Sequence, residues 1–361
     1  MLDPNPGPNP LPNPLQLKCN SQQIHVRSQG RIHFGLMEIA EFQPNCYGGI
    51  GLMVEHSIAV VQATILQTPA LSQCRIQADA HWRPRIEAVA NQWLQTHSQL
   101  PVDSIRVIES PLPHQGLGSG TQMACTVAAL LSAAERVLIS NRSTSDAVKS
   151  DVSIPTLLNM DLLTKLSQRG KRSNIGLCGF MAGGFVVDHG VPVSSEAGNT
   201  SARTQSVPFP NWPVLIVQDT NSRGESGNDE AAMFERCSRC PNPNRGAMGL
   251  LVQQEILPAI HASEWNKFDI ALGQYGRWAG QIFEPVQGGI YRTARIAQSV
   301  KAAKRLGLQG ATQSSWGPTV CAFAQDPEHA DWCQSHLQSE IPGVDVKVTK
   351  AANYPAQVNT T

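Results

Sequence analysis

The spacing of apolar and polar residues predicts strands through the first part of the chain. Residues 15–66 hold short runs rich in Ile, Val and Leu, a composition typical of β-strands. Farther along, Ile86, Val89, Trp93 and Leu94 recur at helical spacing within 86–97, which predicts a helix with one apolar side. The expected strands are 15–18, 24–27, 30–38, 48–55, 57–66 and 102–109.

A polar stretch rich in Ser, Thr and Gly divides the chain near its middle. Residues 191–206 have this composition, so we expect them to link a first domain, 15–190, to a second, 207–361. Helical patterns dominate the second domain. The predicted strands and helices together indicate an α+β fold, and we find no internal repeat in the sequence. The other expected elements are helices over 154–168, 230–236, 248–261, 264–279 and 291–306, strands over 184–188, 214–219 and 344–350, and a small-residue loop over 310–324 that leads into a strand.

One stretch places prolines, glycines and hydroxyls immediately before an apolar run. Residues 111–122 read Pro-Leu-Pro-His-Gln-Gly-Leu-Gly-Ser-Gly-Thr-Gln, and the Ala- and Leu-rich run after them predicts a buried helix that begins near Ser119 or Thr121. Glycines permit a tight turn, and the first amides of a helix lack internal partners. With the positive end of the helix dipole, these amides form a site for phosphate. The alternative is a plain turn before a core helix, but the order strand, loop, helix favours phosphate binding.

Composition limits the classes of partner. In 361 residues, 41% are apolar and only 16% charged, and 28 Lys plus Arg balance 28 Asp plus Glu. A neutral chain has no global field for nucleic acid or a membrane surface, so we expect local groups to meet any anion. We find no apolar stretch of membrane-spanning length.

The cysteines and the first residues indicate a cytoplasmic protein. Nine cysteines are widely spread, many of them in apolar runs, as is typical of reduced, buried thiols. Residues 1–14 are rich in Pro and Asn; we expect a disordered tail, with neither the basic nor the apolar region of a signal peptide. Cys237 and Cys240 have metal-ligand spacing, but no second pair completes a four-ligand set.

Cations gather in a second Gly/Ser-containing segment. Arg169, Lys171 and Arg172 precede Ser173 and suit a phosphate or a carboxylate, although cations at a helix C-terminus also suit the helix dipole. His33, His114 and His189 are candidates for acid–base work, but a single His is more often simply hydrogen-bonded in place.

Three loops occur in the order typical of the GHMP kinase superfamily. They are Gly-Arg-Ile-His at 30–33, Pro-x3-Gly-Leu-Gly-Ser-Gly-Thr at 113–121 and the small-residue loop at 313–319. The middle one resembles the phosphate loop of that superfamily, and the last resembles the loop that braces it, although Ser-Ser-Trp-Gly-Pro-Thr departs from the usual Gly-Ser-Gly-x-Gly form. The resemblance implies an α+β, two-domain GHMP-kinase-like fold, with an N-terminal domain like ribosomal protein S5 and a ferredoxin-like C-terminal domain.

Within the superfamily the motifs are similar to those of the β-ribofuranosylaminobenzene 5'-phosphate synthase family. The similarity spans most of residues 24–324 and includes the Gly-Thr-Gln end of the phosphate loop and the segments 48–51, 172–176 and 183–188. It implies condensation of 5-phosphoribosyl 1-pyrophosphate with 4-aminobenzoate or 4-hydroxybenzoate, with release of CO2 and pyrophosphate, in tetrahydromethanopterin biosynthesis of C1 metabolism. It also implies a homodimer, Mg²⁺ as cofactor and no organic cofactor.

A missing carboxylate separates the chain from the kinases. Many of them carry Ser-Gly-Val/Ile-Asp ahead of a Gly-Gly pair, and alignment on Ser173 and on residues 183–184 puts Gly176 in the place of that Asp. A glycine cannot accept the proton of an attacking hydroxyl. An ATP-dependent small-molecule kinase is nevertheless the alternative reading, and a non-catalytic binding protein with the same fold is the third.

The resemblance assigns roles residue by residue. We expect amides and hydroxyls of the phosphate loop to hold pyrophosphate, cations to hold a phosphate or the benzoate carboxylate, and acids to hold Mg²⁺. The predicted catalytic residues are Arg31, His33, Lys171, Arg172 and Asp188. The predicted substrate- and phosphate-binding residues are His114, Gly116, Leu117, Gly118, Ser119, Gly120, Thr121, Gln122, Ser173, Ser315 and Gly317. The predicted metal ligands are Glu55 and Asp219.

Overall fold

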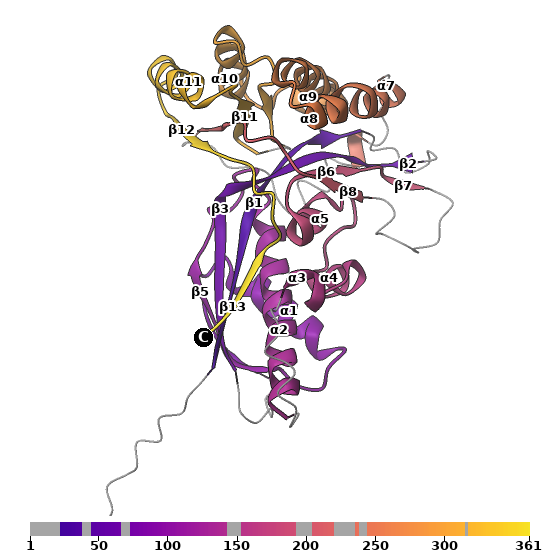
Figure 1. Ribbon diagram of the computed structural model, residues 1–361, viewed down its shortest axis with the longest axis vertical. Helices are drawn as coiled ribbons and strands as arrows, with labels where there is room; N and C mark the ends of the chain where they lie inside the picture. The colour runs from indigo at the N-terminus through magenta and orange to yellow at the C-terminus, as the bar shows by residue number, and fades with distance from the viewer. Residues whose placement is uncertain are drawn as a thin grey trace, which may run out of the picture.

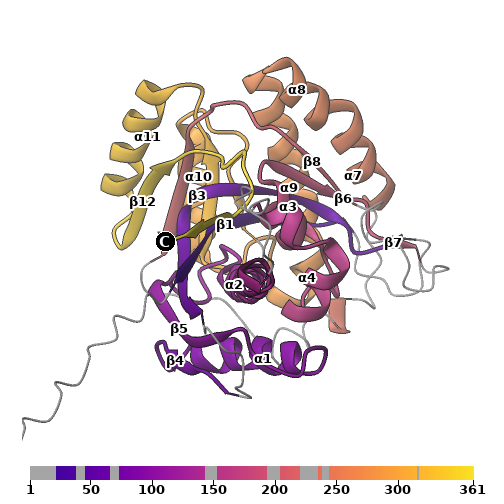
Figure 2. The same ribbon diagram turned by 60° about the horizontal axis from the view of Figure 1, so that its bottom comes forward.

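Two largely antiparallel sheets, each covered by helices, organise the chain (Figures 1 and 2). The computed structural model describes residues 22–37, 45–65, 73–142, 153–192, 204–219, 235–237, 244–314 and 317–361. The expected tail at 1–14, the expected strand at 15–18 and most of the expected linker lie outside these ranges.

The first sheet is built around two long strands, β1 (Gln23–Leu36) and β3 (Gly49–Ile65). Its main strand order is β13-β1-β3-β5-β4. The first residues of β3, 49–52, pair with β6 instead of β5, and β6 pairs with β8. Only the pairing of β4 with β5 is parallel. The remaining strands are β4 (Arg75–Gln77), β5 (Val102–Glu109), β6 (Phe185–Asp188), β8 (Thr204–Val207) and β13 (Gln357–Thr360).

Helices bury one face of the first sheet. The central one is α2 (Ser119–Arg142), which is viewed nearly end-on in Figure 2, and residues from Met123 to Ala134 are almost entirely buried. A window of α2, Ser119–Asn141, is long and apolar enough to cross a membrane, contrary to the expectation from sequence, but 78% of it is buried inside the protein. Its composition is thus that of a core helix. The others are α1 (Arg83–Leu94), α3 (Ile154–Leu157), α4 (Met160–Ser167) and α5 (Ile175–Ala182).

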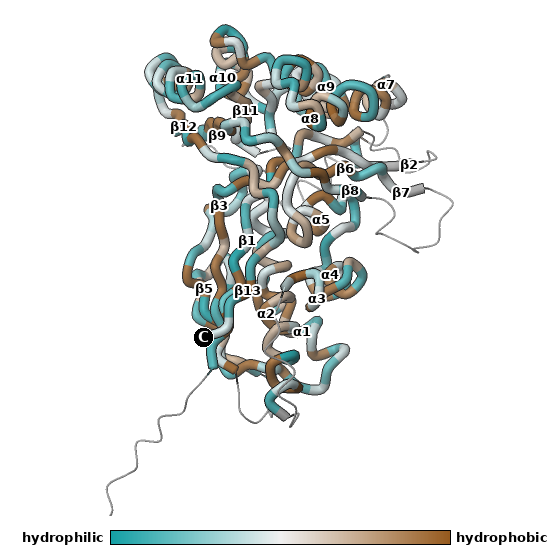
Figure 3. The backbone as a smooth tube through the Cα atoms, in the orientation of Figure 1, coloured by the Kyte–Doolittle hydropathy of each residue, from teal (hydrophilic) through white to brown (hydrophobic). Residues whose placement is uncertain are grey.

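The second sheet has the order β10-β11-β9-β12 and packs between two groups of helices. These helices carry both teal and brown segments in Figure 3, as expected for helices with one side buried. The strands are β9 (Val214–Asp219), β10 (Thr312–Gln313), β11 (Thr319–Phe323) and β12 (Val344–Thr349). The helices are α7 (Arg245–Leu251), a π-helical turn η3 (Val252–Ile256), α8 (Leu257–Ala262), α9 (Trp265–Gln287), α10 (Ala294–Arg305) and α11 (Pro327–Glu340). A separate pair joins β2 (Asn45–Cys46) to β7 (Val191–Pro192).

Several expected elements differ from those observed. Each of the two long strands was expected as two pieces, because Gly and polar residues interrupt the apolar pattern; the structure instead keeps β1 continuous through a register shift between Ser28 and Gly30. The helix expected over 154–168 is two helices, since Leu158 is extended and Asn159 caps the second by accepting from the amide of Leu162 at 2.8 Å. Helix α9 continues past the expected end at 279, and Pro285 lies in its last turns.

The sequence analysis missed the short strands β2, β4, β7 and β8, and it also missed three longer elements. Helix α5 is glycine-rich and was read as a loop, and α11 lacks a clear apolar stripe. Strand β13 pairs with β1, with Ile24 opposite Thr360, so residues 357–360 belong to the first sheet although they were expected in the second domain.

Candidate active site

A cavity of about 430 Å³ opens where the two sheets meet. It is lined by the end of β1, the start of α1, the N-terminus of α2, the segment before α5, the face of α9 and residues near 290 and 313. We call it the central cavity. Its size is that of a small-molecule site.

The segment before α2, residues 111–118, turns back on itself; we call it the glycine loop. Gly116 has φ +77° and Gly118 has φ +69°, a backbone region that other residues rarely adopt. The carbonyl of Gly118 accepts the amides of Thr121 and Gln122 at 3.0 Å, which starts the helix. The sequence therefore predicted this helix start correctly, and the first turn of α2 faces the central cavity.

The second sheet braces the glycine loop. The Ser314 hydroxyl donates to the carbonyl of Gly116 at 2.7 Å and accepts the amide of His33 at 3.1 Å. Thr319 donates to the carbonyl of Gln115 at 2.5 Å, and Gly317 packs directly against Gly116. The predicted bracing loop is therefore in place. Ser315, predicted as a ligand, lies outside the described residues.

Arg31 runs along the glycine loop toward α5. Its Nε lies 2.9 Å from the position that a Cβ on Gly118 would take, and its Nη1 lies 3.5 Å from the corresponding position on Gly176. A Cβ on Gly176 would also approach Cγ2 of Thr121 to 2.9 Å. The place of the missing kinase carboxylate is thus beside Arg31 and the first turn of α2, and a side chain there would require the Thr121 methyl group to shift.

Residues 168–173 bring further cations to the cavity wall. Arg169, Lys171 and Arg172 line it, together with Ser173, as does Arg85 from α1. With Arg31 these are five cationic side chains, whereas the described lining contains no Asp or Glu. Such a wall has the charge to hold a polyphosphate.

Asp188 was predicted to be catalytic, but the structure places its carboxylate away from the cavity wall. Its carboxylate is fully buried, accepts the amide of Asn174 at 2.7 Å and accepts the amide of Gly190 at 3.1 Å. It does not line the central cavity. Asp188 therefore holds the segment ahead of α5 in place rather than meeting a substrate.

His33 lines the cavity as a neutral group. Burial, with the nearby Arg31 charge as a second cause, lowers the pKa of His33 to about 3. Its Nδ1 accepts the amide of Gly35 at 3.1 Å, so the proton of the neutral ring lies on Nε2, which is 3.3 Å from the Ser173 hydroxyl. His33 thus positions Ser173 without adding charge.

Another part of the cavity lining is apolar. Gly276, Ala279, Gly280 and Phe283 present one face of α9, and Tyr291 adds a second aromatic ring nearby. Gly276 packs against Thr312 and Gly280 against Ile290, so the apolar contact surface offered to an aromatic ring comes chiefly from Phe283 and Tyr291. The central cavity therefore has a cationic side and an apolar side.

Some of the other predicted residues line the central cavity, and others are buried away from it. Leu117 is buried in the core, and its carbonyl accepts the amide of Arg31 at 2.9 Å. Gln122 is fully buried and donates to the carbonyl of Gly176 at 3.0 Å. Both residues therefore support the cavity wall without lining the cavity. The predicted residues that the structure brings together on the cavity wall are Arg31, His33, His114, Gly116, Gly118, Ser119, Gly120, Thr121, Lys171, Arg172 and Ser173.

The described residues do not fit a Mg²⁺ ion held by the protein. Glu55 lies 3.5 Å from Lys350 and accepts from the hydroxyl of Tyr354, while Asp219 lies 3.5 Å from Arg295, and neither lines the cavity. No group of three or more His, Cys, Asp or Glu with metal-binding geometry occurs in the described part of the chain. Mg²⁺ prefers carboxylate and phosphate oxygens. The placement of Glu55 and Asp219 thus gives the predicted metal role no support.

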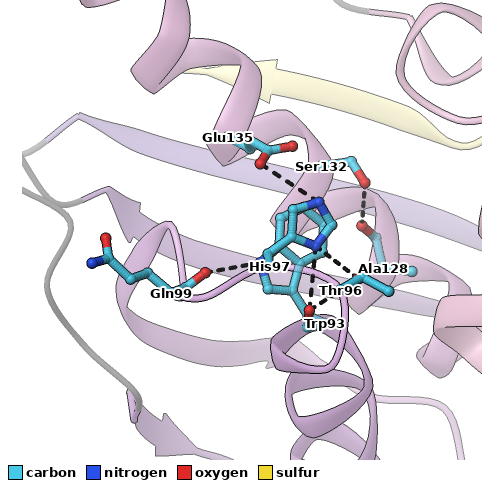
Figure 4. Close-up of polar contacts among 7 residues, drawn as sticks. All are labelled: Trp93, Thr96, His97, Gln99, Ala128, Ser132 and Glu135. Atoms are coloured by element: carbon cyan, nitrogen blue, oxygen red, sulfur yellow. Dashed lines mark hydrogen bonds and ion pairs between the residues drawn. The ribbon is translucent and has the colours of Figure 1, made fainter.

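Two other polar features lie away from the central cavity. His97 stacks on Trp93 with ring centroids 3.9 Å apart, and its Nε2 lies 3.6 Å from Glu135, a cluster shown in Figure 4. Cys237 is buried and forms no disulfide with a described residue, and Cys240 lies outside the described residues. The described free cysteines include Cys74, Cys125, Cys178, Cys321 and Cys333, as expected for reduced thiols.

Sequence reasoning missed several residues of the wall. The sequence contained a signal that could have identified Arg85. An arginine in the first turn of a helix lies at the unfavourable, positive end of the helix dipole. Ser314 adjoins the predicted loop but was not chosen. Phe283 and Tyr291 had no local signal, since only the packing of α9 brings them to the cavity.

Comparison with known proteins agrees with this fold. Residues 256–342 match the family model described as GHMP kinases C terminal. The chain is 24% identical over 311 residues to beta-ribofuranosylphenol 5'-phosphate synthase of Archaeoglobus fulgidus, covering 83% of this chain and 87% of the relative. It is 25% identical over 321 residues to the protein of the same name from Methanothermobacter thermautotrophicus, covering 84% and 89%. Among solved structures, MDDEF in complex with MVAPP, AMPPCP and Magnesium matches with a TM-score of 0.60 at 12% identity, covering 94% of this chain and all of that one (100%).

The chain has a GHMP-kinase-like two-sheet α+β fold, and its residues 256–342 match the GHMP kinase C-terminal family model. Within that class it is a homologue of the beta-ribofuranosylphenol 5'-phosphate synthases. Both the fold class and the narrower resemblance expected from the sequence are thereby confirmed.

Proposed function

We propose that the protein condenses 5-phosphoribosyl 1-pyrophosphate with a para-substituted benzoate, releasing pyrophosphate and CO2. The observation that carries the proposal is the two-sided central cavity, which pairs a cationic wall for phosphates with an apolar wall for an aromatic ring. The relatives are named for a phenol product, which favours 4-hydroxybenzoate over 4-aminobenzoate.

The reaction balances without a proton acceptor at the ring. The bond from ribose C1 to pyrophosphate breaks, and its electron pair leaves with the pyrophosphate. The ring carbon that bears the carboxylate bonds to C1, and the pair from the breaking bond to CO2 then restores aromaticity. A site without a described carboxylate on its wall and with a neutral His33 suits this chemistry.

The protein supplies charge and geometry. Amides at the start of α2 and the cations around it stabilise negative charge on the leaving pyrophosphate, because preorganised donors act where charge develops. Lys171 and Arg172 are the candidates for the 5'-phosphate or the benzoate carboxylate. The wall made by α9 holds the ring against C1, and such positioning makes a large contribution to rate.

A kinase would need a group that receives the proton of the attacking hydroxyl. The place aligned with that group is Gly176, and the space beside it is filled by Thr121 and Arg31. We therefore place the kinase second. Pathway, cytoplasmic location and homodimer stay predictions.

The test is incubation of the purified protein with 5-phosphoribosyl 1-pyrophosphate, Mg²⁺ and each benzoate, followed by mass analysis of the product. A phosphoribosylated phenol or aniline without the carboxyl group supports the proposal. Consumption of ATP with transfer of phosphate to a small alcohol, and no C-riboside, would establish the kinase instead.

A further inference from the structure

Arg85 holds an unusual position at the start of α1. It is the third residue of that helix, is half-buried and lines the central cavity. Its guanidinium carbon lies 3.4 Å from the position that a Cβ on Gly120 would take. The cation thus faces the first turn of α2 while standing in the first turn of its own helix.

Both helices present their positive ends to this guanidinium. A cation near a helix N-terminus is unfavourable, and partial burial adds a desolvation cost. Burial lowers the pKa of Arg85 from its ordinary value, and the side chain has no hydrogen bond or ion pair with any residue that the structure describes. An anion in the cavity would offset these costs, because a half-buried charge without a partner lowers stability.

The neighbouring Arg83 shows the contrast. It stands in the same turn of α1, but its guanidinium donates to the carbonyl of Ile76 at 2.8 Å and lies 3.9 Å from Glu87. Its side chain is 48% exposed, and it does not line the cavity. Arg83 therefore has protein partners, whereas Arg85 is oriented for a ligand.

We propose that Arg85 is a catalytic residue that binds the pyrophosphate group at the N-terminus of α2 and neutralises it as it leaves. This inference rests on the proposed function and adds to it a residue from outside the loops that carry the family resemblance. When the C1–O bond breaks, the electron pair passes to a pyrophosphate oxygen, and the Arg85 guanidinium stays protonated and donates to it. With Arg31 on the other side of the glycine loop, the protein's own cations enclose the leaving group, and its binding needs no carboxylate-held metal.

Calorimetric titration with inorganic pyrophosphate, in the presence of a chelator, tests the inference on the full chain. We expect wild type to bind and Arg85→Ala to bind on the order of tenfold to hundredfold more weakly, since charge-assisted hydrogen bonds are lost. Arg85→Lys should recover part of the affinity, because the charge remains but the forked geometry does not. Arg83→Ala is the matched control and should bind within about twofold of wild type.

Thermal melts establish that each variant is folded before binding is measured. Without ligand, Arg85→Ala should be at least as stable as wild type, because it removes an unpaired cation. In turnover, Arg85→Ala should lower kcat and leave the KM for the benzoate unchanged. Equal pyrophosphate affinity of Arg85→Ala and wild type would overturn the inference, as would absence of wild-type binding in chelator.

The two proposals fail in different ways. If wild type makes no C-riboside but binds pyrophosphate through Arg85, the proposed reaction is wrong and the anion site stands. If wild type makes the C-riboside and Arg85→Ala makes it as fast, the reaction stands and the role of Arg85 is wrong.

Discussion

The hydroxyl of Ser314, which follows β10 of the second sheet, donates a hydrogen bond to the carbonyl of Gly116 at 2.7 Å. The glycine loop therefore takes its shape from a residue about 200 positions further along the chain. Under the proposed function, phosphate binding at that loop requires contact between the two sheets.

Ser314→Ala should weaken pyrophosphate binding by about tenfold and lower the free energy of unfolding by about 1 kcal/mol, because a buried carbonyl and the amide of His33 lose their partner. Urea unfolding and calorimetry measure the two effects. Ser335→Ala, which removes an exposed hydroxyl bonded to Asp331, should change neither. Unchanged binding by Ser314→Ala would show that the brace is dispensable.

Gly118→Ala should reduce turnover strongly while the protein stays folded. A Cβ there meets a left-handed φ of +69° and comes within 2.9 Å of Arg31 Nε, which costs on the order of 1–2 kcal/mol and displaces the arginine. The matched change is Gly249→Ala in α7, where nothing lies within 4 Å of the new Cβ and helix propensity improves. Steady-state rates of both variants test this prediction. A turnover rate of Gly118→Ala similar to that of Gly249→Ala would contradict it.

Asp188→Asn should act on stability rather than on the chemical step. The carboxylate accepts two backbone amides, so the variant should lose about 1–3 kcal/mol and raise KM with little change in kcat. The exposed Asp345→Asn should be close to neutral. A loss of kcat at saturating substrates, with stability unchanged, would restore Asp188 as a catalytic residue.

Phe283→Ala should raise the KM for the benzoate by about tenfold and leave the affinity for pyrophosphate unchanged. The ring forms part of the apolar wall, and its loss removes contact area for the aromatic substrate. Trp332→Ala, an exposed aromatic on α11, is the control and should leave both values as in wild type. Equal weakening of both ligands would place the aryl group elsewhere.

His33 should make the free energy of unfolding fall toward acid. Its pKa is about 3 when folded against 6.5 when exposed, so between these values the unfolded chain binds a proton that the folded chain does not. Above pH 6.5 the titration of His33 does not affect the free energy of unfolding. Below pH 6.5 it lowers that free energy by up to about 1.4 kcal/mol per pH unit. Urea unfolding at pH 7, 6 and 5 should bring the curves of wild type and His33→Gln closer together as pH falls. A constant difference would mean that His33 titrates normally.

Local patterns predicted much of the fold, and the family resemblance predicted the class. Strand β5 and the start of α2 follow from apolar runs beside Gly and Pro, and the bounds agree with those observed. Helix α5 escaped because its glycines serve close packing: a Cβ on Gly179 would collide with Met53. Strand β13 escaped because its exposed, polar residues gain order only by pairing with β1.

The sequence predicted those parts of the cavity wall that are formed by residues close together in the chain. The glycine loop and the cations at 169–172 were recognised from neighbouring residues, and the structure brings them together. Arg85 and Phe283 come from helices distant in sequence, and only tertiary packing places them on one cavity. Asp188 was misread because an acid near a substrate loop and an acid that holds backbone amides look alike in sequence.

The central claim is that ring attack, loss of CO2 and loss of pyrophosphate are one reaction in this cavity. Incubation with 4-hydroxybenzoate labelled at the carboxyl carbon and with 5-phosphoribosyl 1-pyrophosphate tests it most directly. The account predicts that labelled CO2 and pyrophosphate are released in equal amounts. It also predicts that neither is released unless both substrates are present. Release of pyrophosphate without labelled CO2, or a product that keeps the label, would contradict it.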